Sequence, residues 1–350
     1  MKTLFCAILG FVLTAGPGLF AQATPQESLL VLSKVDRTLT IVDPVSLKAV
    51  AKVPAGDDPH EVVASADGRF AFVSNYGYGA YHTITVVDLV AQKVQRTVDV
   101  GPLRGPHGLA FAEGKLWFTA EVAKAIARYD PESHQVDWVL GLGQNRTHMI
   151  DVFPGASRIM TTNVNSGTVS ILDKVTVQPQ GPVPGAQTDR PNYVQPHGPP
   201  VDWNQTVVSV GKGPEGFAVS PDGKEAWIGN GLDGTVSIVD LAAKKVVETI
   251  PAGIPGINRV KFTPDGRLVL LSSLRNPYLT VFDAASRRKI RQVPVGHASE
   301  GILVQPDGAR IFVSCSPDDS VAVIDTKTLR VIGRIAAGHE PDGLAWAVRR

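Results

Sequence analysis

The sequence repeats itself with a period that matches the roughly 40–45 residues of one four-stranded propeller blade. Each copy contains a short β-branched run that stops at an aspartate, as in Thr-Val-Ser-Ile-Val-Asp at 235–240. The seven aspartates are Asp43, Asp88, Asp130, Asp173, Asp240, Asp283 and Asp325. Their spacings are 45, 42, 43, 67, 43 and 42 residues. Seven copies predict an all-β fold, a seven-bladed β-propeller with four antiparallel strands in each blade.

The copy at 213–253 shows why four strands are expected in each repeat. Residues 216–219 precede a Ser-Pro-Asp-Gly turn at 220–223, in which proline pre-sets φ and glycine accepts a positive φ. Residues 225–229, 235–239 and 245–250 follow as three further β-rich runs. A single sheet of this size exposes apolar faces, so each blade needs neighbours on both sides.

The two ends of the chain are expected to complete one blade together. Residues 29–33, 38–42 and 49–53 supply three strands, and residues 343–348 supply the fourth. Pairing them in one sheet closes the ring and removes the open strand edges that invite aggregation. We therefore predict a single propeller domain over residues 24–350.

Residues 1–23 have the pattern of a secretory signal peptide. Lys2 supplies the positive start, residues 4–13 the apolar core, and Ala-Gln-Ala at 21–23 a small-x-small cleavage site. No later run reaches the roughly 18 apolar residues of a membrane-spanning helix. The sequence thus predicts a soluble monomer that is exported to a bacterial periplasm or secreted.

Charge and cysteine content narrow the function classes. The chain has 34 Lys and Arg against 33 Asp and Glu, and the two balance once Lys2 is removed with the signal peptide. This is not the basic excess of a dedicated binder of nucleic acid or anionic membranes. Without Cys6, only Cys315 remains, so no intrachain disulfide is expected.

The long interval after Asp173 contains an insertion of roughly 24 residues relative to one blade period. It runs from about residue 175 to 204 and is rich in proline and glycine. Because it follows the third strand of its blade, we expect it on the face opposite the channel mouth described below. Tyr193 and Trp203 are expected to anchor it to the propeller, and docking of a partner is the alternative role.

Val-Ser-Asn at 73–75, the run at 235–240 and the Ser-Pro-Asp-Gly turn make the chain resemble the YVTN-type propeller repeat family. The resemblance covers essentially the whole chain after residue 23. It implies the propeller fold and a secreted or periplasmic location. Members of that family include DNA-binding periplasmic proteins, surface-layer proteins, lactonase-like hydrolases and the haem-binding propellers of nitrite reductases. The resemblance alone does not choose among these functions.

Differences between the repeats point to a candidate site. We aligned the start of each innermost strand on the middle residue of Pro-x-Gly or its equivalent. The seven aligned residues are His60, His107, His148, Glu215, Asn258, Glu300 and Asp342. They are expected to surround one mouth of the central channel. The seven aspartates, by contrast, share one residue type and are expected only to shape turns.

Further polar and aromatic residues map to loops on the same face as this mouth. They are Tyr76, Tyr78, Tyr81, His82, Arg104, Arg146, His297 and His339. Binding residues commonly lie on loops that a rigid scaffold positions. Together with Asn258, these loop residues are the predicted substrate-binding set.

His60, His107, His148 and Glu215 come from neighbouring blades and suit Zn²⁺ or a similar divalent metal. Such a metal would lower the pKa of a bound water to about 7 and polarise a carbonyl. Glu300 or Asp342, across the channel, would act as general base, and Arg104 or Arg146 would hold an anionic group. The alternative is that the histidines only hydrogen-bond to channel waters and loop carbonyls.

Two function classes stay open, and the sequence does not decide whether the chain is an enzyme. The first is a small-ligand-binding protein, with a lactonase-like metal-dependent hydrolase as its catalytic form. The second is a non-catalytic scaffold for protein, cell-wall material or single-stranded nucleic acid. Tyr76, Tyr78 and Tyr81 would suit base stacking, but the balanced charge makes nucleic acid the least expected partner. Without a Walker loop, a Rossmann fingerprint or a Cys-x-x-Cys-His run, neither a nucleotide cofactor nor covalent haem is expected.

Overall fold

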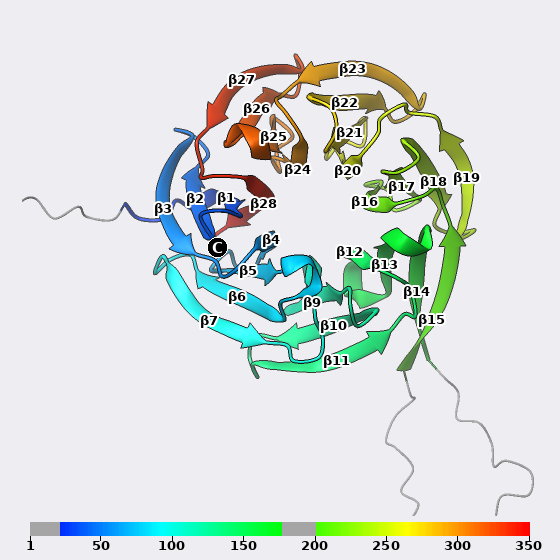
Figure 1. Cartoon of the computed structure of the whole chain (residues 1–350), viewed down its shortest axis with the longest axis horizontal. Coiled ribbons are helices and arrows are strands. Elements are labelled where there is room, and N and C mark those ends of the chain that lie inside the picture. Colours follow the sequence, from blue (N-terminus) through cyan, green and yellow to red (C-terminus); the bar gives the residue numbers. More distant parts are fainter. Residues whose placement is uncertain (1–21, 177–200) are drawn as a thin grey trace, which may run out of the picture.

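The structure, a computed structural model, describes residues 22–176 and 201–350. Seven four-stranded antiparallel sheets are arranged as blades around a central axis (Figure 1). Apart from the strands, the described residues contain only four short 3-10 turns, at Gly77–Gly79, Pro154–Ala156, Val164–Ser166 and Ser316–Asp318. The predicted all-β, seven-bladed propeller is confirmed.

Each blade has an innermost, a second, a third and an outermost strand. The innermost strands are β4 (Pro59–Ala64), β8 (Pro106–Ala112), β12 (Thr147–Val152), β16 (Pro214–Val219), β20 (Ile257–Phe262), β24 (Ser299–Val304) and β28 (Pro341–Val348). The second strands are β5 (Phe70–Asn75), β9 (Lys115–Ala120), β13 (Arg158–Asn163), β17 (Glu225–Asn230), β21 (Leu268–Ser273), β25 (Arg310–Cys315) and β1 (Glu27–Ser33). The third strands are β6 (Thr83–Asp88), β10 (Ala125–Asp130), β14 (Thr168–Thr176), β18 (Thr235–Asp240), β22 (Tyr278–Asp283), β26 (Ser320–Asp325) and β2 (Thr38–Asp43). The outermost strands are β7 (Lys93–Asp99), β11 (Gln135–Gly141), β15 (Val201–Ser209), β19 (Lys245–Ile250), β23 (Arg288–Pro294), β27 (Arg330–Ile335) and β3 (Lys48–Pro54).

One blade is assembled from both ends of the described chain. Its strand order is β28-β1-β2-β3, and β28 is antiparallel to β1, with Leu29 opposite Trp346. Both terminal strands begin two residues earlier than the sequence predicted, at Glu27 and Pro341. The β28–β1 ladder places the first and last parts of the described chain in one sheet.

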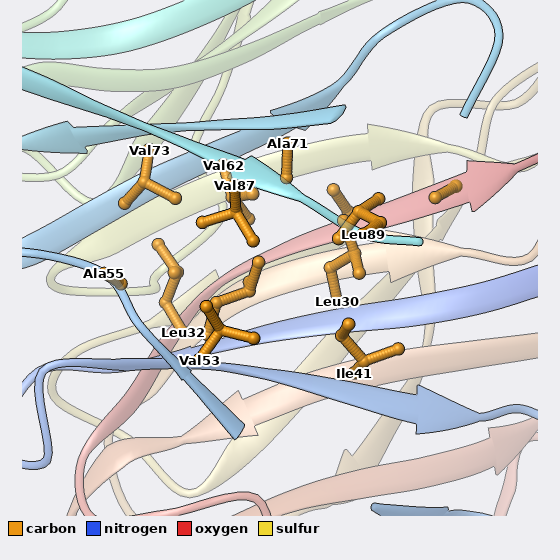
Figure 2. Packing of buried hydrophobic residues seen from close by; sticks show 13 residues of the cluster. Leu30, Leu32, Ile41, Val53, Ala55, Val62, Ala71, Val73, Val87 and Leu89 are labelled. Atoms are coloured by element: carbon orange, nitrogen blue, oxygen red, sulfur yellow. The ribbon is translucent and has the colours of Figure 1, made fainter. Parts of the chain in front are cut away.

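The cores lie between the blades, where facing sheets pack against each other. Figure 2 shows one such cluster, in which Leu30, Leu32 and Ile41 of one blade face Val73 and Leu89 of the next. Second and third strands are buried on both faces, which is why they appear in the sequence as continuous apolar runs. Each fully buried aliphatic side chain contributes roughly 1.5–3 kcal/mol.

The repeated aspartates shape the turns after the third strands, as predicted. Asp43 Oδ1 accepts a hydrogen bond from the Val45 amide at 2.8 Å, and Asp240 Oδ1 accepts one from Ala242 at 2.9 Å. Asp173 is different, because β14 continues past it instead of turning. Its carboxylate pairs with Arg158 Nε at 2.6 Å.

The long interval between Asp173 and Asp240 contains a lengthened hairpin formed by β14 and β15. β14 and β15 each have nine residues, and their pairing continues to Thr176 opposite Val201. Trp203 lies in β15 and packs against Trp138, with ring centroids 5.7 Å apart. Residues 177–200, with Tyr193 and the expected position of the insertion, lie outside the described residues, as does most of the proposed signal peptide. No helix in the described part of the chain has the length and apolarity needed to cross a membrane.

Candidate functional site

The seven residues aligned from the sequence line a single cavity at one end of the channel. This cavity has a volume of about 140 Å³ and is lined by all seven, from His60 to Asp342. Each is the second residue of its innermost strand. The register with the second strand shifts at this point in every blade, for example between Pro59 and Val62. Such a bulge leaves the second and third residues unpaired and turns the second side chain toward the axis.

Hydroxyl groups on neighbouring blades fix the backbone of the same residues. Thr119 Oγ1 donates a hydrogen bond to the His148 carbonyl at 2.6 Å, and Ser314 Oγ donates one to the Asp342 carbonyl at 2.6 Å. The third residue of several innermost strands is glycine because the strands approach closely. A Cβ on Gly108 would lie 2.4 Å from the His148 carbonyl oxygen. The ring of side chains therefore stands on a rigid base.

A cluster with the composition of a metal site lies at one wall of the cavity, where His107 and His148 are lining residues and Glu121 is not. His107, Glu121 and His148 are all buried, and each offers one ligand atom within 4.8 Å of those of the other two. His148 Nδ1 lies 2.5 Å from Glu121 Oε1, and His148 Nε2 lies 2.8 Å from Glu215 Oε2. The His107 ring is 3.8 Å from the His148 ring and 5.0 Å from the His60 ring. The three predicted histidines thus lie side by side in one cavity.

The two central histidines have opposite protonation preferences. Burial lowers the pKa of His148, but the carboxylates of Glu215 and Glu121 more than offset burial and raise it above the usual value. Burial and the neighbouring His148 and His60 lower the pKa of His107 well below its usual value. His107 is therefore neutral, and its buried Nδ1 has no hydrogen-bond partner among the described residues.

Arg146 and Tyr76 hold the carboxylates of this wall. Arg146 Nε is 3.5 Å from Glu121 Oε1, and Arg146 Nη1 is 3.4 Å from Glu215 Oε1. The Tyr76 hydroxyl donates a hydrogen bond to Glu121 Oε2 at 2.6 Å. Burial raises the pKa of Glu215, but His148 and Arg146 outweigh it and lower the pKa to about 2. Glu215 is therefore a fixed acceptor at neutral pH.

The opposite wall is a pair of carboxyl groups beside a lysine. Lys34 Nζ lies 2.8 Å from Glu300 Oε2 and 3.4 Å from Asp342 Oδ2, and His60 Nε2 lies 3.7 Å from Asp342 Oδ2. Burial and the charge of Asp342 raise the pKa of Glu300 to about 7, against the opposing effect of Lys34. Burial raises the pKa of Asp342, but His60 and Lys34 bring it below its usual value. Near neutral pH Glu300 is therefore partly protonated, whereas Asp342 is ionised.

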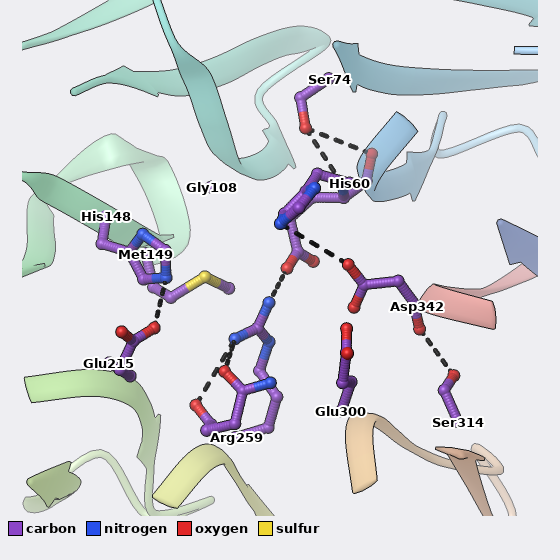
Figure 3. Close-up of polar contacts among 12 residues, drawn as sticks. His60, Ser74, Gly108, His148, Met149, Glu215, Arg259, Glu300, Ser314 and Asp342 are labelled. Carbon is purple, nitrogen blue, oxygen red and sulfur yellow. Dashed lines mark hydrogen bonds and ion pairs between the residues drawn. The ribbon is translucent and has the colours of Figure 1, made fainter. Parts of the chain in front are cut away.

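An ion pair crosses the channel beneath the cavity. Arg259 lies between the two walls in Figure 3, and its Nη2 pairs with Glu61 Oε1. Arg259 Nη1 also donates a hydrogen bond to Asn258 Oδ1 at 2.7 Å. Arg259 lines the small cavity, whereas Glu61 lines a larger cavity on the other side. The pair thus separates the two ends of the channel.

The loop residues predicted as substrate-binding divide into two groups. Tyr76, Tyr78 and Arg146 line the cavity with the ring residues, and Tyr78 is 86% exposed over its mouth. The others do not line the cavity. They are Tyr81, His82, Arg104, His297 and His339.

The three outlying histidines pair with carboxylates of the rim loops instead. His82 Nδ1 lies 2.8 Å from Asp99 Oδ1. His297 is likewise 2.8 Å from Asp318, and His339 is 2.7 Å from Asp36. Arg104 donates a hydrogen bond to the Ala80 carbonyl at 3.2 Å. These contacts fix the rim loops outside the cavity.

Sequence reasoning missed Glu121, Lys34 and Arg259. Glu121 and Lys34 directly follow second strands, at the same place as Tyr76, so a second alignment on that position would have found them. Arg259 occupies the third position of its innermost strand, where four other blades have glycine. The signal that could have identified Arg259 is its large charged side chain at a position where most blades have glycine.

The fold and the buried polar mouth define a seven-bladed propeller with a polar cavity at one end of its channel. The chain belongs to the YNCE-like β-propeller family, whose profile matches residues 1–167 and 193–310. It is also 24% identical over 347 residues to a dihydro-heme d1 dehydrogenase of Pseudomonas aeruginosa. That match covers 83% of this chain and 64% of the relative, so the chain spans less than two thirds of that protein.

Solved structures show the same fold at low identity. A protein of unknown function from Desulfotomaculum acetoxidans superposes with a TM-score of 0.72 at 12% identity, covering 92% of this chain and 99% of its own. A putative 6-phosphogluconolactonase from Bacteroides uniformis superposes with a TM-score of 0.69 at 13% identity, covering 92% of this chain and 100% of its own. The dihydro-heme d1 dehydrogenase NirN in complex with DHE superposes with a TM-score of 0.62 at 16% identity, covering 92% of this chain and 66% of its own. At these identities the likeness concerns the fold alone.

Proposed function

We propose that this propeller binds a small ligand through a divalent metal ion held by His107, Glu121 and His148. The observation that carries the proposal is the buried His107 Nδ1, which has no hydrogen-bond partner among the described residues. Leaving such an atom unsatisfied costs roughly 1–3 kcal/mol, and coordination to a metal would remove that cost. Two imidazoles and a carboxylate within 4.8 Å suit Zn²⁺ and leave a position for a ligand.

Glu215 would orient a metal ligand rather than bind the metal. It accepts a hydrogen bond from His148 Nε2, while His148 Nδ1 faces Glu121. A carboxylate on the far nitrogen fixes the tautomer and ring orientation of a metal-ligating histidine. Glu121 therefore replaces Glu215 in the ligand set expected from the sequence. His60, beside His107, is the remaining candidate for a fourth ligand.

Hydrolysis of a small ester or lactone is the reaction class that we propose for this cavity. A bound metal would supply Lewis acidity and a water of lowered pKa. On the opposite wall, Glu300 has its pKa raised to about 7 beside Asp342, so it could accept or donate a proton at the substrate near neutral pH. Lys34 and Arg146 offer positive charge for an anionic substrate group.

A tetrapyrrole is the second candidate ligand, because one relative is named as a dihydro-heme d1 dehydrogenase. The lack of a Cys-x-x-Cys-His run argues only against covalent attachment. The cavity volume of about 140 Å³ favours the smaller ligand, since organic ligands occupy pockets of roughly 300–1,000 Å³. A macrocycle would have to lie over the mouth, against the exposed Tyr78.

Metal analysis of the tag-free chain tests the proposal. After equilibration with Zn²⁺ and gel filtration, we expect about one ion per chain in the wild type and none in His107→Ala. His297→Ala is the matched control, because His297 is 80% exposed on the rim, and it should retain the ion. Failure of the wild type to take up metal would overturn the metal site. A haem-type absorption band on titration with haem would favour the tetrapyrrole.

We also propose that the chain is exported, because residues 1–23 carry the signal-peptide pattern. The mature protein should begin near Thr24 and be found outside the cytoplasm. N-terminal sequencing of protein from the native host measures this directly, and recovery of Met1 would contradict it.

A further inference from the structure

The other end of the channel contains a second, larger cavity. Its volume is about 670 Å³, within the roughly 300–1,000 Å³ of small-molecule sites. It shares no lining residue with the metal-binding cavity, and the Glu61–Arg259 pair lies between the two. Pro221, Pro264 and Pro306, from the turns after the innermost strands, line it as well. A ligand here would not touch the metal site.

The ring of residues around this second cavity is apolar with two exceptions. The fifth residues of the seven innermost strands all line it, and five are aliphatic: Val63, Ala110, Ala218, Leu303 and Ala345. The remaining two are Asp151 and Lys261. Because five blades satisfy the fold with an aliphatic side chain, the fold does not require one acid and one base at this level.

Neither charged group forms a close ion pair, although the charge of Lys261 acts on Asp151 at longer range. Among the described residues, no acidic group lies within 4.0 Å of Lys261, and no basic group lies that close to Asp151. The hydrogen bond to the Asp151 carboxylate comes from the next backbone amide, Val152 N, at 2.9 Å. Trp346, which lines the same cavity, has a buried Nε1 without a hydrogen-bond partner. The cavity therefore offers one acidic and one basic side chain to a ligand.

The rest of the lining suits an apolar group. Phe111, Phe217, Phe262 and Met149 contribute to the wall. We propose that this cavity binds a small zwitterion with an apolar side chain, of the class of free α-amino acids. Its ammonium group would pair with Asp151, its carboxylate with Lys261, and its side chain would pack on the aromatic wall. A ligand with only one charge would pair with one of the two protein groups and leave the other without a partner.

Calorimetric titration with L-phenylalanine and L-leucine tests this proposal. Phenethylamine and 3-phenylpropionate, which each lack one of the two charges, are the matched probes. The wild type should bind at least one of the amino acids and should bind both analogues at least roughly tenfold more weakly. No binding of either amino acid at millimolar concentration would overturn the proposal, as would equal affinity for the analogues.

Variants locate the site. Asp151→Asn and Lys261→Met should each weaken amino-acid binding by roughly tenfold or more. Lys93→Met, which changes an exposed lysine on an outermost strand, should not. The double variant Asp151→Lys with Lys261→Asp should restore part of the affinity. Such recovery would show that the single variants lose affinity through the lost charge and not through misfolding. His107→Ala should bind the amino acid normally. Unchanged affinity in folded Asp151→Asn would overturn the assignment.

Discussion

The two ends of the channel are built from the same seven strands but have opposite chemistry. At the end with the His107–Glu121–His148 cluster, the second residues of these strands are all polar, and six of the seven are histidine or acidic. At the other end, the fifth residues are aliphatic except for Asp151 and Lys261. The second residue lies in a bulge, free of the strand ladder, so its side chain can vary without changing the pairing. The comparison teaches that the repeat determines where side chains point and leaves their chemistry free.

Strand β28 lines both ends of the channel, so its removal should have the largest effect on stability. Deletion of residues 343–350 takes away most of β28, including Trp346 and its contact with β1. We expect a loss of roughly 5 kcal/mol or more and association through the exposed edge. Thermal unfolding and gel filtration measure this. A truncated chain that stays monomeric and melts like the intact one would show that the β28–β1 pairing is dispensable.

Breaking the Glu61–Arg259 ion pair, which lies between the two ends of the channel, should have the next largest effect on stability. Arg259→Met leaves Glu61 without its partner, and we expect destabilisation of about 3–5 kcal/mol, because an uncompensated charge remains buried. The double variant with Glu61→Gln should recover much of that loss. Arg267→Met, which removes an exposed pair with Asp265, should cost less than about 1 kcal/mol. Similar losses for Arg259→Met and Arg267→Met would contradict this role.

The carboxyl pair of Glu300 and Asp342 should make stability depend on pH. The pKa of Glu300 is raised from 4.5 to about 7, so the folded state favours its protonated form. Its contribution is therefore fully present below pH 4.5 and is lost as pH rises through 7. The upper limit is about 3 kcal/mol. Glu300→Gln should flatten this part of the stability profile in urea titrations at a series of pH values. Parallel profiles for the two proteins would count against it.

A small effect is expected from the hydroxyl groups that hold the ring backbone. Thr119→Val removes the donor to the His148 carbonyl, and Ser314→Ala removes the donor to the Asp342 carbonyl. Each should cost about 1–2 kcal/mol, because a buried carbonyl loses its hydrogen bond. Thr119→Val should also weaken Zn²⁺ uptake, whereas Ser314→Ala should not. Denaturant unfolding and metal titration together separate the two effects, and equal metal affinities would argue that the backbone anchor does not position His148.

Much of the site could be predicted from the sequence, and the residues that were missed or misplaced share one cause. The seven ring residues were identified from the repeat alone, because bulges at equivalent positions turn them toward one axis. Glu121 was not, since its proximity to His107 and His148 depends on a contact between two blades. His297 and His339 were placed on the correct face but not in the cavity. Their pairing with Asp318 and Asp36 on the rim depends on loop conformation, which the period does not encode.

The sequence by itself determined the number of blades, the four strands of each blade and the residues that face the channel mouth. These follow from local signals that recur along the chain: β-rich runs, the Pro-Asp-Gly turns at 221–223, 264–266 and 306–308, and the seven aspartates that close the third runs. Only the tertiary structure decided which side chains meet. Contacts such as His148 with Glu121 and Glu215, Lys34 with Glu300, and Arg259 with Glu61 join different blades. Their energies depend on burial and on distances of a few ångströms, neither of which spacing along a chain can specify.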